Sequence, residues 1–229
     1  MGASVIIAAA GSASRMQGTD KLMYRIHGRE VFMYSVLAFA SARCTDKIII
    51  VTAKEKIDAV KECLSKAEIK VPAEVVCGGE TRQKSVMNGL CRCDESSDCI
   101  MIHDAARPMI TPELIDSLYK KVISEGLGAA ALGVPVKDTI KQVSQDGSII
   151  STPPRKDLRI AQTPQCFETE LYRKAFAQAE KSGCDYTDDC QLVEAIGKKV
   201  YIADGDYCNI KITTPEDLSL AEAYLKERE

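Results

Sequence analysis

The chain has 229 residues, and its 30 lysines and arginines nearly balance 33 aspartates and glutamates, for a net charge of −3. This length and the 45% share of hydrophobic residues fit one large α/β domain with a single core. The sequence has no long run of one charge sign, and no apolar stretch approaches the roughly 20 residues of a membrane span. We therefore expect neither nucleic acid nor a membrane as a partner.

Ten cysteines are spread through helix-like and strand-like segments. The N-terminus enters a strand-like run without the basic segment and cleavage site of a signal peptide, so we expect a cytoplasmic protein. Thiols stay reduced in that compartment. The spacing of Cys91, Cys93 and Cys99 fits no common structural zinc site, and we interpret the cysteines as packing groups.

The first element spans residues 4–21, where an apolar run leads into a loop of small residues. Residues 5–7, Val-Ile-Ile, are typical of a parallel strand that is buried on both faces. The small residues 11–14 allow backbone N–H groups to approach phosphate oxygens, and Arg15 and Lys21 add positive charge. A plain turn between strand and helix is the alternative for this stretch alone. The stretch has neither a Walker A sequence nor the spaced glycines of a dinucleotide fingerprint.

The next segments alternate between extended and helical patterns. Residues 22–26 predict a short extended piece, and residues 31–42 have helical spacing. Residues 47–52 predict another buried strand, and residues 54–66 an amphipathic helix. The first third of the chain therefore has a β-α-β-α order.

A second glycine loop follows the predicted strand of residues 73–77. Gly78 and Gly79 precede Thr81, which is a plausible N-cap for a helix ending at Leu90. The carboxyl ends of strands are where ligands bind in open parallel sheets. This loop is therefore a second candidate for ligand binding.

A carboxylate lies directly after the predicted fourth strand, residues 99–103. Asp104 is either a ligand-binding group at the sheet edge or a turn cap, and this motif alone leaves both open. Pro112 is typical of a first helical position and opens a helix predicted to end at Ser124. Residues 128–136 predict a fifth strand.

Residues 137–160 have the pattern of an inserted arm. Asp146-Gly147 separates two alternating segments, residues 139–144 and 148–152, and this is a strong hairpin signal. An exposed hairpin must cover its edges, and a second copy of the chain is the simplest cover. We therefore expect a homodimer joined through the arm.

The last third contains the lysine that is hardest to explain by packing. We expect a helix over residues 169–181, a further helix with Thr187 or Asp188 as its N-cap, and a strand over residues 199–203. Lys211 is predicted to lie in an apolar strand just before a capped helix. A lysine is rarely buried without a partner, so Lys211 is the first functional candidate.

Nine short motifs follow one another along the whole chain: AAAGSASRM, Asp20-Lys21, GGETRQKSV, HDAARP, VKDTIK, TPPRKDL, AQTPQ, YTDD and NIKITTPEDL. Together they resemble the 2-C-methyl-D-erythritol 4-phosphate cytidylyltransferases of the non-mevalonate isoprenoid pathway. The resemblance implies a nucleotide-diphospho-sugar-transferase-like (Rossmann-like) fold, with a mostly parallel sheet flanked by helices and an inserted hairpin arm. It also implies CTP as donor, methylerythritol phosphate as acceptor, Mg²⁺ as the divalent metal, pyrophosphate as leaving group and an arm-joined homodimer.

The resemblance also assigns roles to individual positions. Arg15, Lys21 and Lys211 match residues at the reacting phosphates, and Asp104 matches the acid where nucleotide, metal and acceptor meet. The loops around cytosine, ribose and phosphate match at Ala9, Ala10, Gly11, Gly79 and Ser85. The residues around the acceptor match at Arg107, Thr139, Arg155, Thr163 and Thr187, with Thr139 and Arg155 coming from the partner's arm.

The sequence departs from the family pattern at two positions. Ala13 replaces a usual glycine, which requires a negative φ there. Cys208 stands where an acidic residue is common, so Asp104 is the one protein carboxylate expected at the metal.

Two other functions compete with this interpretation. A sister enzyme, ribitol-5-phosphate cytidylyltransferase, shares the loop, the arm and the lysine, but it usually varies the HDAARP and TPPR motifs. A nucleotide-sensing module without activity could lose Lys211, whereas this chain retains Arg15, Lys21, Asp104 and Lys211 together.

Overall fold

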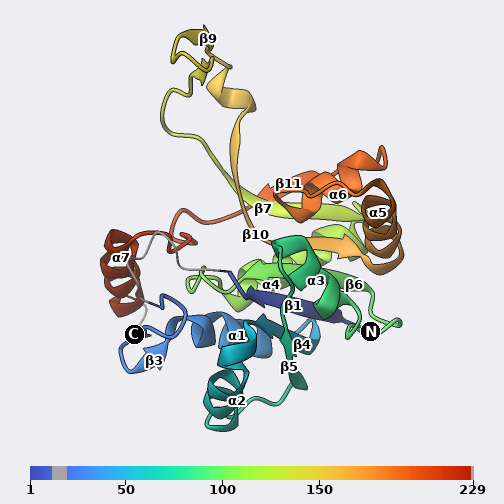
Figure 1. The fold of residues 1–229 in the computed structure, drawn as a ribbon, viewed down its shortest axis with the longest axis vertical. Helices are drawn as coiled ribbons and strands as arrows, with labels where there is room; N and C mark the ends of the chain where they lie inside the picture. Colours follow the sequence, from blue (N-terminus) through green and yellow to red (C-terminus); the bar gives the residue numbers. More distant parts are fainter. Residues whose placement is uncertain (12–19, 228–229) are drawn as a thin grey trace.

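The computed structural model describes residues 1–11 and 20–227. Its centre is a seven-stranded sheet flanked by helices (Figure 1), so the predicted α/β class is confirmed. In spatial order the strands are β11 (Tyr201–Asp204), β7 (Ala129–Pro135), β10 (Arg159–Glu168), β6 (Cys99–Asp104), β1 (Ala3–Ala9), β4 (Thr45–Thr52) and β5 (Ala73–Cys77). All neighbours are parallel except β10, which is antiparallel to both β6 and β7.

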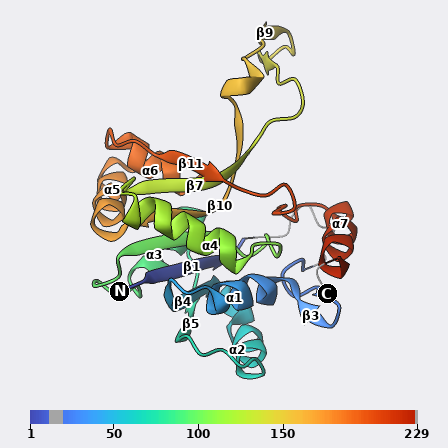
Figure 2. The same cartoon turned by 180° about the vertical axis from the view of Figure 1, so that it is seen from behind.

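Helices cover both faces of the sheet, as Figures 1 and 2 show from opposite sides. The seven α-helices of the described chain are α1 (Val31–Ser41), α2 (Ile57–Ser65), α3 (Arg82–Leu90), α4 (Pro112–Tyr119), α5 (Thr169–Ser182), α6 (Asp189–Ala195) and α7 (Pro215–Lys226). Short helical turns cover Lys54–Lys56, Lys120–Ser124 and Arg155–Asp157. Of the helices described, none is long and apolar enough to span a membrane.

Side chains of β1 point alternately into two cores. Val5 and Ile7 pack with α1, α2 and α4 on one face, and Ile6 packs with α3, α5 and α6 on the other. All three residues are fully buried. This two-sided burial is why the strand is an unbroken apolar run and not an alternating one.

The arm leaves the sheet between β7 and β10 and stands away from it (Figure 1). Its strands β8 (Gln142–Val143) and β9 (Ile149–Ser151) pair antiparallel, so the predicted hairpin is confirmed with shorter strands. Five exposed apolar side chains lie in or beside it: Ile140, Val143, Ile149, Ile150 and Ile160. The arm-joined dimer remains a prediction, and these residues are its natural contact surface.

One local expectation was wrong, and another was confirmed in part. Residues 209–213 form no strand; instead Ile212 donates one backbone hydrogen bond to Ala106, at 2.8 Å. The extended piece predicted at residues 22–26 is confirmed in its last two residues, Arg25–Ile26 (β2), which pair with Arg29–Glu30 (β3). Ile26 and Ile212 pack into a small core with α7, and for residues 209–213 this core does not require a strand.

Candidate active site

The two predicted nucleotide loops meet at the carboxyl ends of β1 and β5. A Cβ atom on Gly78 would lie 2.6 Å from the Cβ of Ala10 and 3.0 Å from the Oγ of Ser85, so only glycine allows this close approach. The predicted nucleotide residues that lie in or beside this contact are Ala9, Ala10, Gly11, Gly79 and Ser85. Their positions agree with a shared site, while their roles remain predictions.

Ser85 shapes the second glycine loop. Its hydroxyl accepts a hydrogen bond from the Gly79 amide at 3.0 Å and donates one to the Thr81 carbonyl at 2.9 Å. Thr81 is the N-cap of α3 as predicted, because its side chain accepts from the Lys84 amide. The loop is therefore fixed to the first turn of α3.

Asp104 and Lys211 form a close ion pair beside these loops. Lys211 Nζ lies 2.6 Å from Asp104 Oδ2, and Arg82 Nε lies 3.7 Å from Asp104 Oδ1. Burial alone would raise the pKa of Asp104, but Lys211 and Arg82 outweigh burial and hold the pKa below its ordinary value. Asp104 is therefore a carboxylate at neutral pH.

Lys211 reaches this position without a strand because its segment is fastened on both sides. The Ile212 amide donates to the Ala106 carbonyl. Arg107 donates to the Asn209 carbonyl at 2.8 Å, and Asn209 donates to the Thr163 carbonyl at 3.0 Å. These contacts hold the segment over the turn that follows β6.

Lys21 joins the first loop to the same segment. Its Nζ donates a hydrogen bond to the carbonyl of Ile212 at 2.8 Å. Ile212 directly follows Lys211, so the Lys21 ammonium lies against the segment that carries Lys211. Arg15, the third predicted phosphate-binding cation, lies outside the described residues.

Arg82 is a site residue that the sequence reasoning missed. Its Nη2 lies 2.7 Å from Oδ2 of Asp189, and the other oxygen of Asp189 accepts from the hydroxyl of Tyr172 at 2.6 Å. Although burial would lower the pKa of Arg82, Asp189 and Asp104 outweigh it and keep the guanidinium charged. The sequence did hold one indication of a special role for Arg82. A cation at the first residue of a helix is unfavourable because the helix dipole is positive there, and α3 begins at Arg82.

Two predicted acceptor residues lie beside Asp104. The Thr163 hydroxyl accepts from the Asp104 amide at 3.0 Å. The Arg107 amide donates to the Asp104 carbonyl at 3.0 Å, and its guanidinium donates to the Asn209 carbonyl. Thr163 and Arg107 therefore contact the backbone of Asp104, while their roles toward the acceptor remain predictions.

The other predicted acceptor residues are placed differently. Thr139 and Arg155 lie in the arm, and Arg155 donates to the Lys137 carbonyl at 2.6 Å within it. Within one chain the arm stands away from the sheet (Figure 1), and the contact of these two residues with the site of another copy remains a prediction. Thr187 accepts from Gln191, and Asp188 takes the N-cap of α6, which settles the alternative left open by the sequence.

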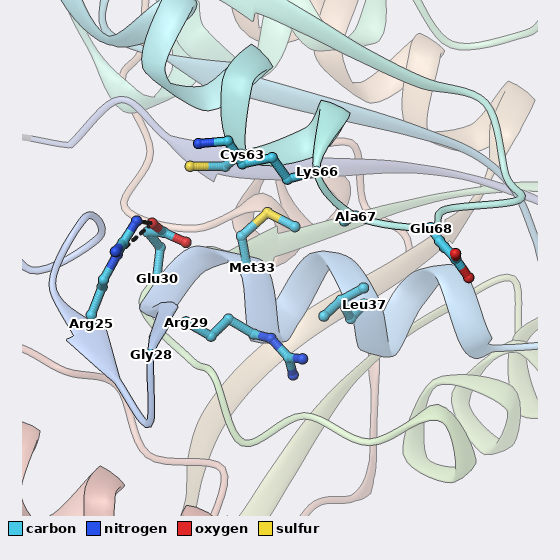
Figure 3. Close-up of a pocket in the computed structure, with 10 residues that line it drawn as sticks. All are labelled: Arg25, Gly28, Arg29, Glu30, Met33, Leu37, Cys63, Lys66, Ala67 and Glu68. Carbon is cyan, nitrogen blue, oxygen red and sulfur yellow. Dashed lines mark hydrogen bonds and ion pairs between the residues drawn. The ribbon is translucent and has the colours of Figure 1, made fainter.

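A separate hollow of about 480 Å³ lies between α1 and α2 (Figure 3). Arg25, Arg29 and Lys66 line it together with the Cys63 thiol, and Arg25 is paired with Glu30. None of its lining residues belongs to the set predicted from the sequence. The hollow is therefore distinct from the candidate active site around Asp104, Lys211 and Arg82.

Comparison with known sequences identifies the family of the chain. Residues 3–227 match the family model of 2-C-methyl-D-erythritol 4-phosphate cytidylyltransferase. A protein of that name from Caldanaerobacter subterraneus subsp. tengcongensis is 44% identical over 99% of this chain and 100% of its own length. Another of that name from Desulforamulus reducens is 41% identical over 97% of this chain and 95% of its own.

Solved structures agree with the sequence comparison. The 4-diphosphocytidyl-2C-methyl-D-erythritol synthase of Anaerococcus prevotii superimposes with a TM-score of 0.88 at 32% identity, covering 98% of both chains. The 2-C-methyl-D-erythritol 4-phosphate cytidylyltransferase of Thermus thermophilus gives 0.78 at 31% identity, covering 99% of this chain and 100% of the other. A family match over nearly the whole length and a shared fold lead to one conclusion: the chain belongs to the 2-C-methyl-D-erythritol 4-phosphate cytidylyltransferase family.

Proposed function

We propose that this chain transfers the cytidylyl group of CTP to 2-C-methyl-D-erythritol 4-phosphate, releasing pyrophosphate and forming 4-diphosphocytidyl-2-C-methyl-D-erythritol. Family membership supports the reaction. The 2.6 Å contact between Lys211 and Asp104, where the loop after β1 and the start of α3 meet, is the observation that carries the assignment of the site.

The reaction needs charge stabilisation and alignment more than a base. A phosphate monoester oxygen is already anionic near neutral pH, so its attack on the α-phosphorus of CTP requires no strong proton acceptor. The Lys211 ammonium has three N–H donors, of which Asp104 uses one. The remaining donors would stabilise negative charge on the α-phosphate as the new bond forms.

Lys21 and Arg15 would hold the departing pyrophosphate. The Lys21 side chain is already fixed by its hydrogen bond to Ile212, so its charge is oriented before the substrate binds. The role of Arg15 rests on its match to the family motif. The loop of small residues predicted after β1 would place Lys21 and Arg15 near one polyphosphate.

The residues fit a Mg²⁺ ion that is held jointly with the substrate. Among the residues described, no group of three or more metal-ligating side chains occurs. Mg²⁺ commonly uses one or two carboxylates together with substrate phosphates, and Asp104 offers one such carboxylate. When bound, the ion would neutralise charge on the triphosphate.

The arm would complete the site in a homodimer. Its exposed apolar residues offer a surface for a second copy, and Thr139 and Arg155 would then contact the acceptor bound by that copy. We also propose the cytoplasm as the location of the protein, where the thiols of its ten cysteines would stay reduced.

A pyrophosphate-release assay with CTP and Mg²⁺ tests the function. We expect turnover with methylerythritol phosphate and little with ribitol 5-phosphate. Preference for ribitol 5-phosphate would assign the sister activity, and no release with either acceptor would indicate a module that only binds nucleotide. Lys174→Ala, on the exposed side of α5, is a suitable control for the site variants.

A further inference from the structure

His103 is a fully buried polar residue at the end of β6, directly before Asp104. Its ring packs edge-on against Phe39 of α1, with centroids 5.1 Å apart. Buried polar groups need hydrogen-bond partners, and both ring nitrogens of His103 have one. The reaction described above gives this residue no role.

The two partners determine which nitrogen carries the proton. Nε2 lies 3.2 Å from the carbonyl oxygen of Arg107, which can only accept, so Nε2 is the donor. Nδ1 lies 3.1 Å from the hydroxyl oxygen of Thr163. His103 is fully buried against Phe39, which favours the uncharged ring, and an uncharged imidazole with its hydrogen on Nε2 accepts at Nδ1.

This arrangement fixes the direction of the Thr163 hydroxyl. A hydroxyl has one hydrogen to donate, and here it goes to His103 Nδ1. The Asp104 amide donates to the same oxygen, which leaves one lone pair open. The Thr163 hydroxyl therefore keeps one position at which it can accept a further hydrogen bond, but it has no hydrogen left for a phosphate oxygen.

We propose that His103 is a positioning residue that fixes Thr163 as a hydrogen-bond acceptor for an alcohol group of the acceptor substrate. This inference rests on the proposed function, because Thr163 is assigned to the acceptor by its match to the family. The role of His103 would also contribute to substrate specificity. A Thr163 hydroxyl that can only accept favours a substrate hydroxyl, which donates, over a phosphate oxygen, which does not. Arg107 contributes through its carbonyl, which holds the imidazole in the required tautomer.

Two amide variants separate this role from simple packing. In His103→Asn the side-chain oxygen can take the place of Nδ1 and still accept from Thr163. In His103→Gln the amide can take the place of Nε2 and donate to Arg107, but Thr163 loses its acceptor. Both variants remove the ring from Phe39, so both should lower the melting temperature.

Steady-state kinetics give different expectations for the two variants. We expect His103→Gln to raise KM for methylerythritol phosphate about tenfold, the effect of one lost hydrogen bond, and KM for CTP less than twofold. His103→Asn should keep the acceptor KM within about twofold of wild type. Equal acceptor KM values in the two variants, or equal changes for CTP and acceptor, would overturn the proposal.

A spectroscopic measurement on the unaltered protein does not depend on how the variants fold. The chain has two histidines, so a His27→Asn sample identifies the ¹⁵N signals of His103. We expect a neutral ring at pH 7 with hydrogen on Nε2 and a hydrogen-bonded, unprotonated Nδ1. A proton on Nδ1 would refute the inference even if the wild-type enzyme uses methylerythritol phosphate. A wild-type protein that does not use this acceptor would contradict the proposed function instead.

Discussion

Replacing Lys211 by alanine is the most direct test of the active-site geometry. The change removes the cation 2.6 Å from Asp104 Oδ2 together with the donors assigned to the α-phosphate. Loss of one preorganised donor to a transition state costs about 3 kcal/mol, which is roughly a hundredfold in kcat. We expect Lys211→Ala to show this loss while keeping its fold.

Arg82, another cation near Asp104, should not compensate for this loss. Arg82 lies 3.7 Å from Asp104 but 2.7 Å from Asp189, so its guanidinium is held on the side of Asp189. Lys211→Arg keeps the charge but changes its geometry and should retain more activity than the alanine variant.

Pyrophosphate release at saturating CTP and acceptor measures the effect on kcat. A thermal melt of each variant should show that folding is preserved, and Lys174→Ala should behave like wild type. If Lys211→Ala kept kcat within threefold of wild type, the phosphate-stabilising role of Lys211 would be wrong.

Three further predictions concern the loop, the arm and α7. Gly78→Ala should raise KM for CTP severalfold, because the new Cβ would collide with the Cβ of Ala10. Initial rates at increasing CTP concentrations, for this variant and for wild type, measure the change in KM. Arg155→Ala should raise KM for the acceptor more than KM for CTP; equal changes would count against contact with the partner's site. Asp217→Ala should destabilise the protein by about 1 kcal/mol at pH 7, because Asp217 accepts from the amides of Thr213 and Thr214 at the start of α7. Burial would raise the pKa of Asp217, but these hydrogen bonds lower it below its ordinary value of about 3.9, so the penalty should shrink as the pH falls below that value. Chemical denaturation at several pH values tests this dependence.

The sequence predicted the parallel part of the sheet because its signals there are local. The apolar run at Val5 to Ile7 requires cover on both faces, and the structure provides it. Thr81 and Pro112 marked helix starts correctly, since capping depends on only a few neighbouring residues. Asp146-Gly147 marked the hairpin turn for the same reason, with Gly147 at φ 85°.

The features that the sequence did not predict depend on contacts between residues that lie far apart in the chain. Residues 161–165 had no predicted element because Pro164 interrupts the pattern, yet they belong to β10, whose register shifts between Ala161 and Gln165. Arg82 and Asp189 are separated by more than one hundred residues, and nothing in either local pattern indicates their ion pair. Lys211 was identified as functional for its unusual setting, although the strand predicted around it was wrong.

The ion pair of Arg82 with Asp189 gives the two oxygens of Asp104 different roles. Asp189 is buried and also bound by Tyr172, so it holds Arg82 more closely than Asp104 does. Asp104 Oδ2 is engaged by Lys211, whereas Oδ1 is 3.7 Å from Arg82 Nε, too far for a normal hydrogen bond. Asp104 would therefore keep Oδ1 for the proposed Mg²⁺ while Oδ2 stays paired with Lys211. A single aspartate would in this way serve both the proposed metal and the lysine.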